Sequence, residues 1–230
     1  MWVLYGLLPP VIVIGLIIAA VVIALRARST GGITFPGVLL GYVHAALFIS
    51  VFLFAAGGAL LVKAGLAQAA GLDFAYNTEE ERYYPDSTGP TVIDPSDEAF
   101  RNNVAIGITL VFIGGALFAI HGIAAVALRR RNAQGQRLVS RTYNVLGLAV
   151  STIAFLAGAG AAVYETLRRY VLESDTVDPW NYPRPGGAIG VTVVFFPLAL
   201  WFAWRVWQEF AAEGSEPDGA PTQETTGVAR

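Results

Sequence analysis

Two histidines, His44 and His121, have the residue type and the spacing that a ligand pair needs. His44 lies eight residues after Pro36 and His121 lies eight residues before Arg129, each inside a long apolar segment. At about 1.5 Å per helical residue, each imidazole is expected about 12 Å from the same membrane face. Paired imidazoles on neighbouring membrane helices suit a b-type haem or an iron, copper or zinc ion. The alternative is two structural histidines, each of which hydrogen-bonds a backbone carbonyl or a Ser or Thr side chain on a neighbouring helix. We favour this alternative and expect no cofactor, with haem b at His44 and His121 as the competing hypothesis.

Composition indicates that the segments carrying these histidines are membrane helices. Hydrophobic residues make up 55% of the 230 residues, charged residues 14%, and the mean hydropathy is +0.56. Soluble chains carry about a quarter charged residues, so a lipid-facing surface is the better explanation. The sequence has no Cys, which excludes disulfides, thiolate metal sites and a cysteine nucleophile. All but one of the 15 basic residues are Arg, a usage typical of GC-rich bacteria, so we expect a multi-pass protein of the bacterial plasma (inner) membrane.

Apolar length predicts an all-α membrane protein with five transmembrane helices. A bilayer core about 30 Å thick needs roughly 20 apolar residues per helix. Five segments qualify: 2–25, 38–62, 104–128, 143–164 and 190–207. The predicted parts are an N-terminal anchor (1–28), a first hairpin (37–131) with an acidic outer loop (69–98), a second hairpin (138–212) and a disordered acidic cytoplasmic tail (213–230).

Basic residues in the short connections predict the orientation. The connection after the first segment carries Arg26 and Arg28, and the one after the third begins with Arg129, Arg130 and Arg131. Such loops face the cytoplasm, which places the N-terminus outside and the C-terminus inside. The three consecutive arginines are expected to fix the topology and to attract anionic lipid headgroups.

An internal duplication relates the two hairpins. Residues 105–112 (AIGITLVF) return as residues 188–195 (AIGVTVVF), and the segment at 38–62 matches that at 143–164 at an offset of 101 residues, for example at Ser50 and Ser151. The hairpins would be parallel repeats forming a four-helix bundle. Small residues allow close helix packing, and the candidates are Gly57, Gly58, Gly114, Gly115, Gly158 and Gly160.

The ends of the third and fifth segments resemble the closing helix of an uncharacterised bacterial integral-membrane family, a domain of unknown function of the DUF5671 type. That helix ends in a Pro-Leu-Trp-Leu-Leu-His-Trp-Arg type segment. Residues 197–207 (PLALWFAWRVW) keep the Pro, Leu, Trp and Arg but lack the His, whereas residues 114–122 (GGALFAIHG) have the His without the Pro or the following Trp. The resemblance covers about residues 37–208 and implies an array of membrane hairpins. It brings no known activity, substrate or cofactor.

Acidic and aromatic residues alternate in the outer segment 73–98, but their spacing matches no calcium-loop pattern. We interpret this segment as a solvated cap that offers a docking surface for a partner. Lys63 and Glu165 are expected at outer helix ends, where long side chains reach the interface. Trp201, Trp204 and Trp207 are interpreted as an interfacial aromatic belt.

No phosphate-binding loop, zinc-protease signature or nucleophile motif is found in the sequence, so we expect no catalytic residues. The favoured function is a non-enzymatic accessory or scaffold subunit that contacts the lipid bilayer and a membrane-protein partner or further copies of itself, and no nucleic acid. The alternatives are a b-haem electron-transfer subunit using His44 and His121, and a small neutral-solute transporter built from the parallel repeats.

Overall fold

The computed structural model describes residues 35–76, 82–86, 89–93, 95–129, 133–171 and 183–213. The predicted anchor (1–28) and residues 214–230 of the predicted tail lie outside the described residues.

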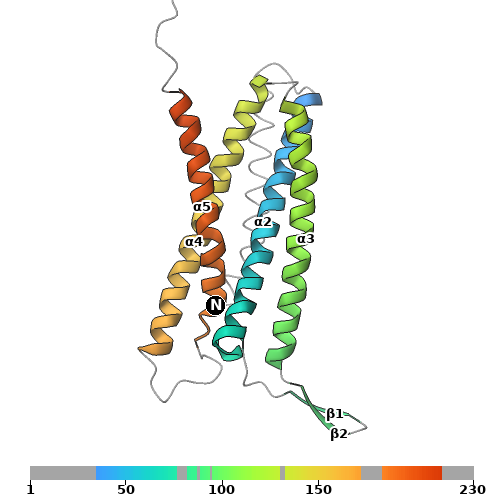
Figure 1. The fold of residues 1–230 in the computed structure, drawn as a ribbon, viewed down its shortest axis with the longest axis vertical. Coiled ribbons are helices and arrows are strands. Elements are labelled where there is room, and N and C mark those ends of the chain that lie inside the picture. Colours follow the sequence, from blue (N-terminus) through green and yellow to red (C-terminus); the bar gives the residue numbers. More distant parts are fainter. Residues whose placement is uncertain are drawn as a thin grey trace, which may run out of the picture.

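Four long helices make up most of the described chain: α2 (Phe35–Ala70), α3 (Pro95–Arg129), α4 (Ala133–Tyr170) and α5 (Gly186–Glu213). Each contains one of the last four predicted apolar segments and is long and apolar enough to cross a membrane. All four extend beyond the predicted segments, because hydropathy marks only the part that lipid covers while backbone hydrogen bonds continue the helix into polar flanks. The helices alternate in direction (Figure 1). We call the end that carries residues 70, 95, 170 and 186 the strand end, and the other the opposite end.

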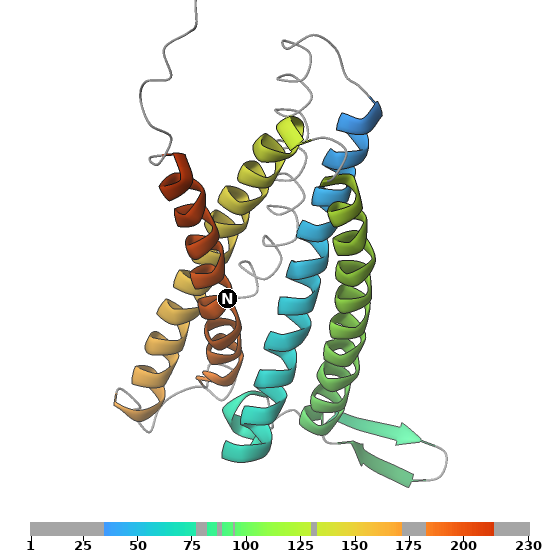
Figure 2. The same ribbon diagram turned by 45° about the horizontal axis from the view of Figure 1, so that its top comes forward.

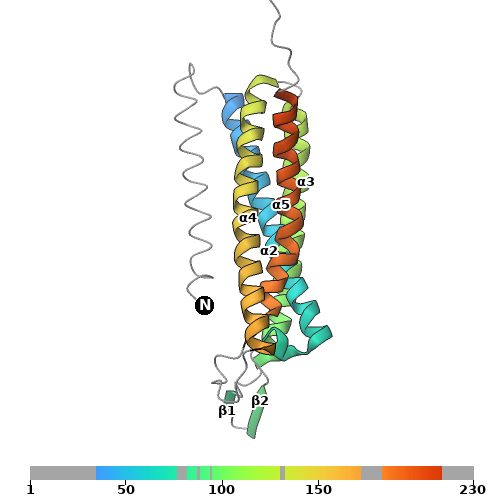
Figure 3. The same cartoon turned by 90° about the vertical axis from the view of Figure 1, so that its left-hand side faces the viewer.

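The four helices form a helical bundle in which α2 is the central element. α3 lies along one side of α2, α5 lies along the other, and α4 pairs with α5 and touches α2 over a shorter stretch. Figure 2 shows α4 crossing α5 while α2 and α3 run side by side. Seen at right angles, the four helices occupy a thin slab (Figure 3). Because α3 packs almost entirely on α2, the bundle formed by the described helices is open on its α3 side.

A small ribbon lies at the strand end, where an acidic loop (69–98) was expected. Strand β1 (Arg82–Asp86) pairs antiparallel with β2 (Gly89–Ile93), with Tyr84 opposite Thr91. The same segment contains the end of α2, the short 3-10 helix η1 (Leu72–Phe74) and the start of α3. Gly71, with φ of 102°, ends α2 in a conformation that favours glycine. The prediction from charge overlooked the aromatic and β-branched residues that favour strands in this segment.

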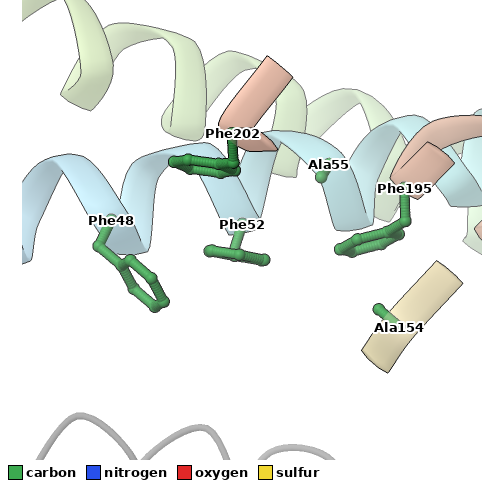
Figure 4. Close-up of a cluster of buried hydrophobic side chains, with 6 residues drawn as sticks. All are labelled: Phe48, Phe52, Ala55, Ala154, Phe195 and Phe202. Atoms are coloured by element: carbon green, nitrogen blue, oxygen red, sulfur yellow. The ribbon is translucent and has the colours of Figure 1, made fainter. Parts of the chain in front are cut away.

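Aromatic side chains fill the space between α2, α4 and α5. The buried cluster consists of Phe48, Phe52 and Ala55 of α2, Ala154 of α4, and Phe195 and Phe202 of α5 (Figure 4). Phe52 and Phe195 stack with ring centroids 6.1 Å apart, and Phe202 is fully buried. The interface between the two hairpins is therefore a packed apolar core.

Candidate functional site

Glycines hold α2 and α3 at backbone contact. A Cβ added to Gly57 would lie 2.7 Å from the carbonyl oxygen of Gly107 and 2.8 Å from the amide nitrogen of Val111. A Cβ added to Gly114 would lie 2.6 Å from the amide nitrogen of Phe54. Real Cβ contacts are essentially never this short, so any larger residue at Gly57 or Gly114 would push the helices apart.

The other predicted packing glycines differ among themselves. Gly158 of α4 is close to α5, since its added Cβ would lie 2.9 Å from a methyl group of Val191. Gly58 and Gly115 leave room for an ordinary van der Waals contact, and Gly160 has open space around it. Gly160 therefore takes no part in the interfaces of the described residues.

Glycines that were not predicted also make close contacts, among them Gly107, Gly147, Gly186 and Gly190. Gly107 receives Gly57 and the side chain of Leu61, Gly190 of α5 lies against the α2 backbone at Ala59, and Gly147 of α4 lies beneath the Phe202 ring. Gly107 and Gly190 belong to the repeated octapeptide, and this repetition was the available sequence signal for them.

His44 is buried between α2 and α4. Its Nδ1 atom lies 2.9 Å from the Leu40 carbonyl oxygen, one turn earlier on α2. Its ring meets the ring of Tyr143 edge to face, with centroids 5.9 Å apart. Tyr143 in turn contacts Phe202 of α5, so His44 belongs to an aromatic junction of three helices.

His121 lies on the other side of α2. Its Nδ1 atom is 2.8 Å from the Leu117 carbonyl oxygen, and its Nε2 atom is 3.5 Å from the hydroxyl oxygen of Tyr42. The two rings are edge to face at 5.7 Å. The partner of the His121 ring is therefore α2, whereas the partner of the His44 ring is α4.

Both histidines bond backbone carbonyls, but these carbonyls belong to their own helices and not to a neighbouring helix, as the structural alternative expected. A hydrogen bond from Nδ1 to a carbonyl also leaves Nε2 as the atom that would bind a metal. Each ring, however, packs on a different tyrosine, Tyr143 for His44 and Tyr42 for His121. Within the described part of the chain, no group of three or more His, Cys, Asp or Glu side chains is arranged to hold a metal ion.

A buried amide–carboxyl pair connects α4 and α5 at the opposite end. The Asn144 side-chain nitrogen donates to the Glu209 Oε1 atom at 2.5 Å. Asn144 is 1% exposed, and neither its Oδ1 atom nor the Glu209 Oε2 atom has a hydrogen-bond partner. Sequence analysis missed both residues. The available signal was an acid among the tryptophans of the predicted aromatic belt, within an apolar span.

An ion pair joins the two hairpins at the strand end, and a further polar contact lies within the second hairpin. Arg169 of α4 bonds the Asp73 carboxylate at 2.6 Å and the Asp73 carbonyl at 3.1 Å. Glu165 was expected to reach the membrane interface, but it is 7% exposed and accepts a hydrogen bond from the Arg184 backbone N–H at 2.6 Å. The carboxylate is held inside because that N–H supplies a partner away from water.

Lys63 was also expected to reach the interface, and its ammonium group instead lies 4.2 Å from the centroid of the Tyr76 ring. The contact is a cation–π interaction. Burial raises the pKa of the Tyr76 hydroxyl, against a smaller lowering effect of Asn103.

The surface of α3 that faces away from α2 is apolar and exposed. Phe112 is 75% exposed and Ile123 is 73% exposed. Near the opposite end this surface has a shallow depression, lined by Phe118, Ala119, Gly122, Ile123 and Val126. We call these five residues the α3 depression.

The remaining predicted residues fall into two groups. Trp201, Trp204 and Trp207 are exposed along α5, as an interfacial belt requires. Arg129 is the last residue of α3, and Arg130 and Arg131 lie outside the described residues.

Comparison of the chain with protein-family models, with curated proteins and with solved structures finds no match. The function proposed next rests on the sequence and on the geometry described above.

Proposed function

We propose that this chain is a non-enzymatic accessory or scaffold subunit of the bacterial plasma membrane, which binds a transmembrane helix of a partner protein through α3. The observation that carries the proposal is the packing of α3. One face of α3 is locked against α2 by Gly57 and Gly114, while the other presents the α3 depression. Small residues at such a place allow close approach of another helix, the main source of helix affinity in lipid.

The proposed arrangement has five spans, an outer N-terminus and an inner C-terminus. The arginines of the connections at the opposite end support a cytoplasmic location for that end. The strand end would then face outward, with the ribbon and the ion pairs of Asp73 and Arg169 as the outer cap.

Matching contacts in the two hairpins support the duplication. Ser50 and Ser151 are both fully buried, and each hydroxyl donates to the carbonyl four residues earlier. Thr109 and Thr192 do the same at 2.8 Å. We therefore retain the proposal of two parallel repeats and, with it, the likeness to the uncharacterised membrane family.

The geometry favours the scaffold over the two alternatives. A neutral-solute path between the repeats would need polar space near the bilayer midplane, where Phe52 and Phe195 stack. A shared haem would need the two imidazoles to face one group, whereas the rings of His44 and His121 pack on different tyrosines. Both alternatives have weaker support than helix packing through α3.

A photo-cross-linking residue placed at Ile123 tests the proposal in native membranes. We expect it to capture one discrete protein, whereas the same probe at Ile153 of α4, which is 68% exposed, labels lipid only. Gly122→Phe fills the α3 depression and should abolish the cross-link.

Gly160→Phe is the matched control for Gly122→Phe, because the structure shows open space around both glycines. It should leave the cross-link intact. Equal labelling from Ile123 and Ile153, or a cross-link that survives Gly122→Phe, would contradict the proposal.

A further inference from the structure

The Asn144–Glu209 pair has two buried oxygen atoms whose hydrogen-bonding capacity is unused. Asn144 Nδ2 donates to Glu209 Oε1, which leaves Asn144 Oδ1 and Glu209 Oε2 as the second atoms of the same amide and the same carboxyl group. Both are shielded from solvent and have no partner. An ionised carboxylate and an amide oxygen are acceptors only, so neither can satisfy the other without an added donor or cation.

The apolar surroundings make it costly to leave these two oxygen atoms without hydrogen-bond partners. Glu209 lies in the apolar span 186–211 and Asn144 in the span 139–170. An ionisable side chain within a membrane segment is expensive to bury unless it is neutralised or paired, and such residues mark ion or proton sites. Buried oxygens without partners in a native fold commonly indicate a bound species.

The charged and titratable groups around the pair come from three helices. On α4, Arg141 stacks over Phe210 at 5.0 Å, and Tyr143 adjoins Asn144 in sequence. On α5, Arg205 lies one turn before Glu209. On α2, the ring of His44 contacts the ring of Tyr143. The pair itself joins α4 to α5.

The first hairpin has no such pair. At the offset of 101 residues Asn144 corresponds to Val43, and at the octapeptide's offset of 83 residues Glu209 corresponds to Val126. Val126 is 59% exposed and lines the α3 depression. The amide and the carboxyl therefore distinguish the second hairpin from the first.

We propose that Asn144 and Glu209 form a binding site for one Na⁺ ion at the opposite end of the bundle. Na⁺ is a hard cation that takes oxygen ligands, and Asn144 Oδ1 and Glu209 Oε2 are the two oxygens that lack a partner. The site is independent of the α3 depression, which lies on another helix.

Thermal unfolding of the full chain in lipid nanodiscs tests the site. The unfolding midpoint of the wild type should rise by several degrees when Na⁺ replaces choline at constant ionic strength. Glu209→Gln should remove this response, because its side-chain amide carries no charge to bind the cation.

Glu98→Gln is the control, since Glu98 is an exposed carboxylate on α3, and it should keep the wild-type response. If Glu209→Gln does not fold, equilibrium binding of radiolabelled Na⁺ to the wild type decides. A wild type that shows neither the Na⁺-dependent midpoint nor Na⁺ binding, or a Glu209→Gln variant that keeps the Na⁺ response, overturns the proposal.

Discussion

Gly57 of α2 lies directly against Gly107 of α3, so that a Cβ on Gly57 would come within 2.7 Å of the Gly107 carbonyl oxygen. This contact lies in the pairing of α2 with α3, which is nearly the whole of the packing that α3 has with the described chain. The stability of the first hairpin should therefore depend on a few backbone-to-backbone contacts.

Gly57→Ala should destabilise the protein. The new methyl group must displace backbone atoms of α3, and overpacking of this kind costs about 1–3 kcal/mol. Gly160→Ala is the matched control, because the new methyl group enters open space. The stability of this variant should equal that of the wild type or be slightly higher. Unfolding in bicelles measures the difference. Equal stability of the two variants would show that α2 and α3 do not pack as described.

Arg169→Gln should weaken the strand end more than Asp73→Asn. Arg169 bonds two carbonyls besides the carboxylate, and its side chain is 11% exposed, so its loss leaves two part-buried carbonyl oxygens without this donor, at a cost of about 1–3 kcal/mol. Asp73 is 47% exposed, and such ion pairs contribute about 0–1 kcal/mol. Arg168→Gln is the control on another face of α4. The ranking is checked by unfolding in bicelles, and a larger effect of Asp73→Asn would contradict it.

His44→Ala and His121→Ala should each lower stability without changing the absorption spectrum. The imidazoles bond carbonyls of their own helices and pack on different tyrosines, contacts that contribute about 0.6 kcal/mol on average in a membrane protein. The loss of stability should be larger for His44→Ala, because the His44 side chain is buried, with 9% exposed. A Soret band in protein from haem-replete cells that disappears in either variant would instead establish the haem hypothesis.

A single cysteine at Glu98 should react with a membrane-impermeant reagent in intact cells, whereas one at Gln208 should react only after permeabilisation. Glu98 lies at the strand end and Gln208 at the opposite end, both side chains are exposed, and the natural sequence has no Cys to interfere. The expected pattern follows from the arginines in the connections at the opposite end. Labelling of the Gln208 position alone would reverse the proposed orientation.

The sequence by itself determined the class of the protein and the location of its helices. Four of the predicted apolar segments lie within α2 to α5, because a run of about 20 apolar residues has few ways to satisfy its backbone in lipid other than a helix. The glycines at positions 57, 114 and 158 were identifiable for a similar reason, since only small residues permit backbone contact between helices.

Only the tertiary structure decided which faces of these helices meet. Hydropathy in a membrane does not distinguish a helix face that contacts protein from one that contacts lipid, because both are apolar. Depth along the helix brought His44 and His121 together in the sequence prediction, whereas rotation about the helix axes directs their rings to Tyr143 and Tyr42. The orientation of α4 and α5 about their axes likewise brings Asn144 into contact with Glu209, 65 residues away in sequence. No spacing in the sequence connects these two polar residues, and only the packing of the helices makes them a pair.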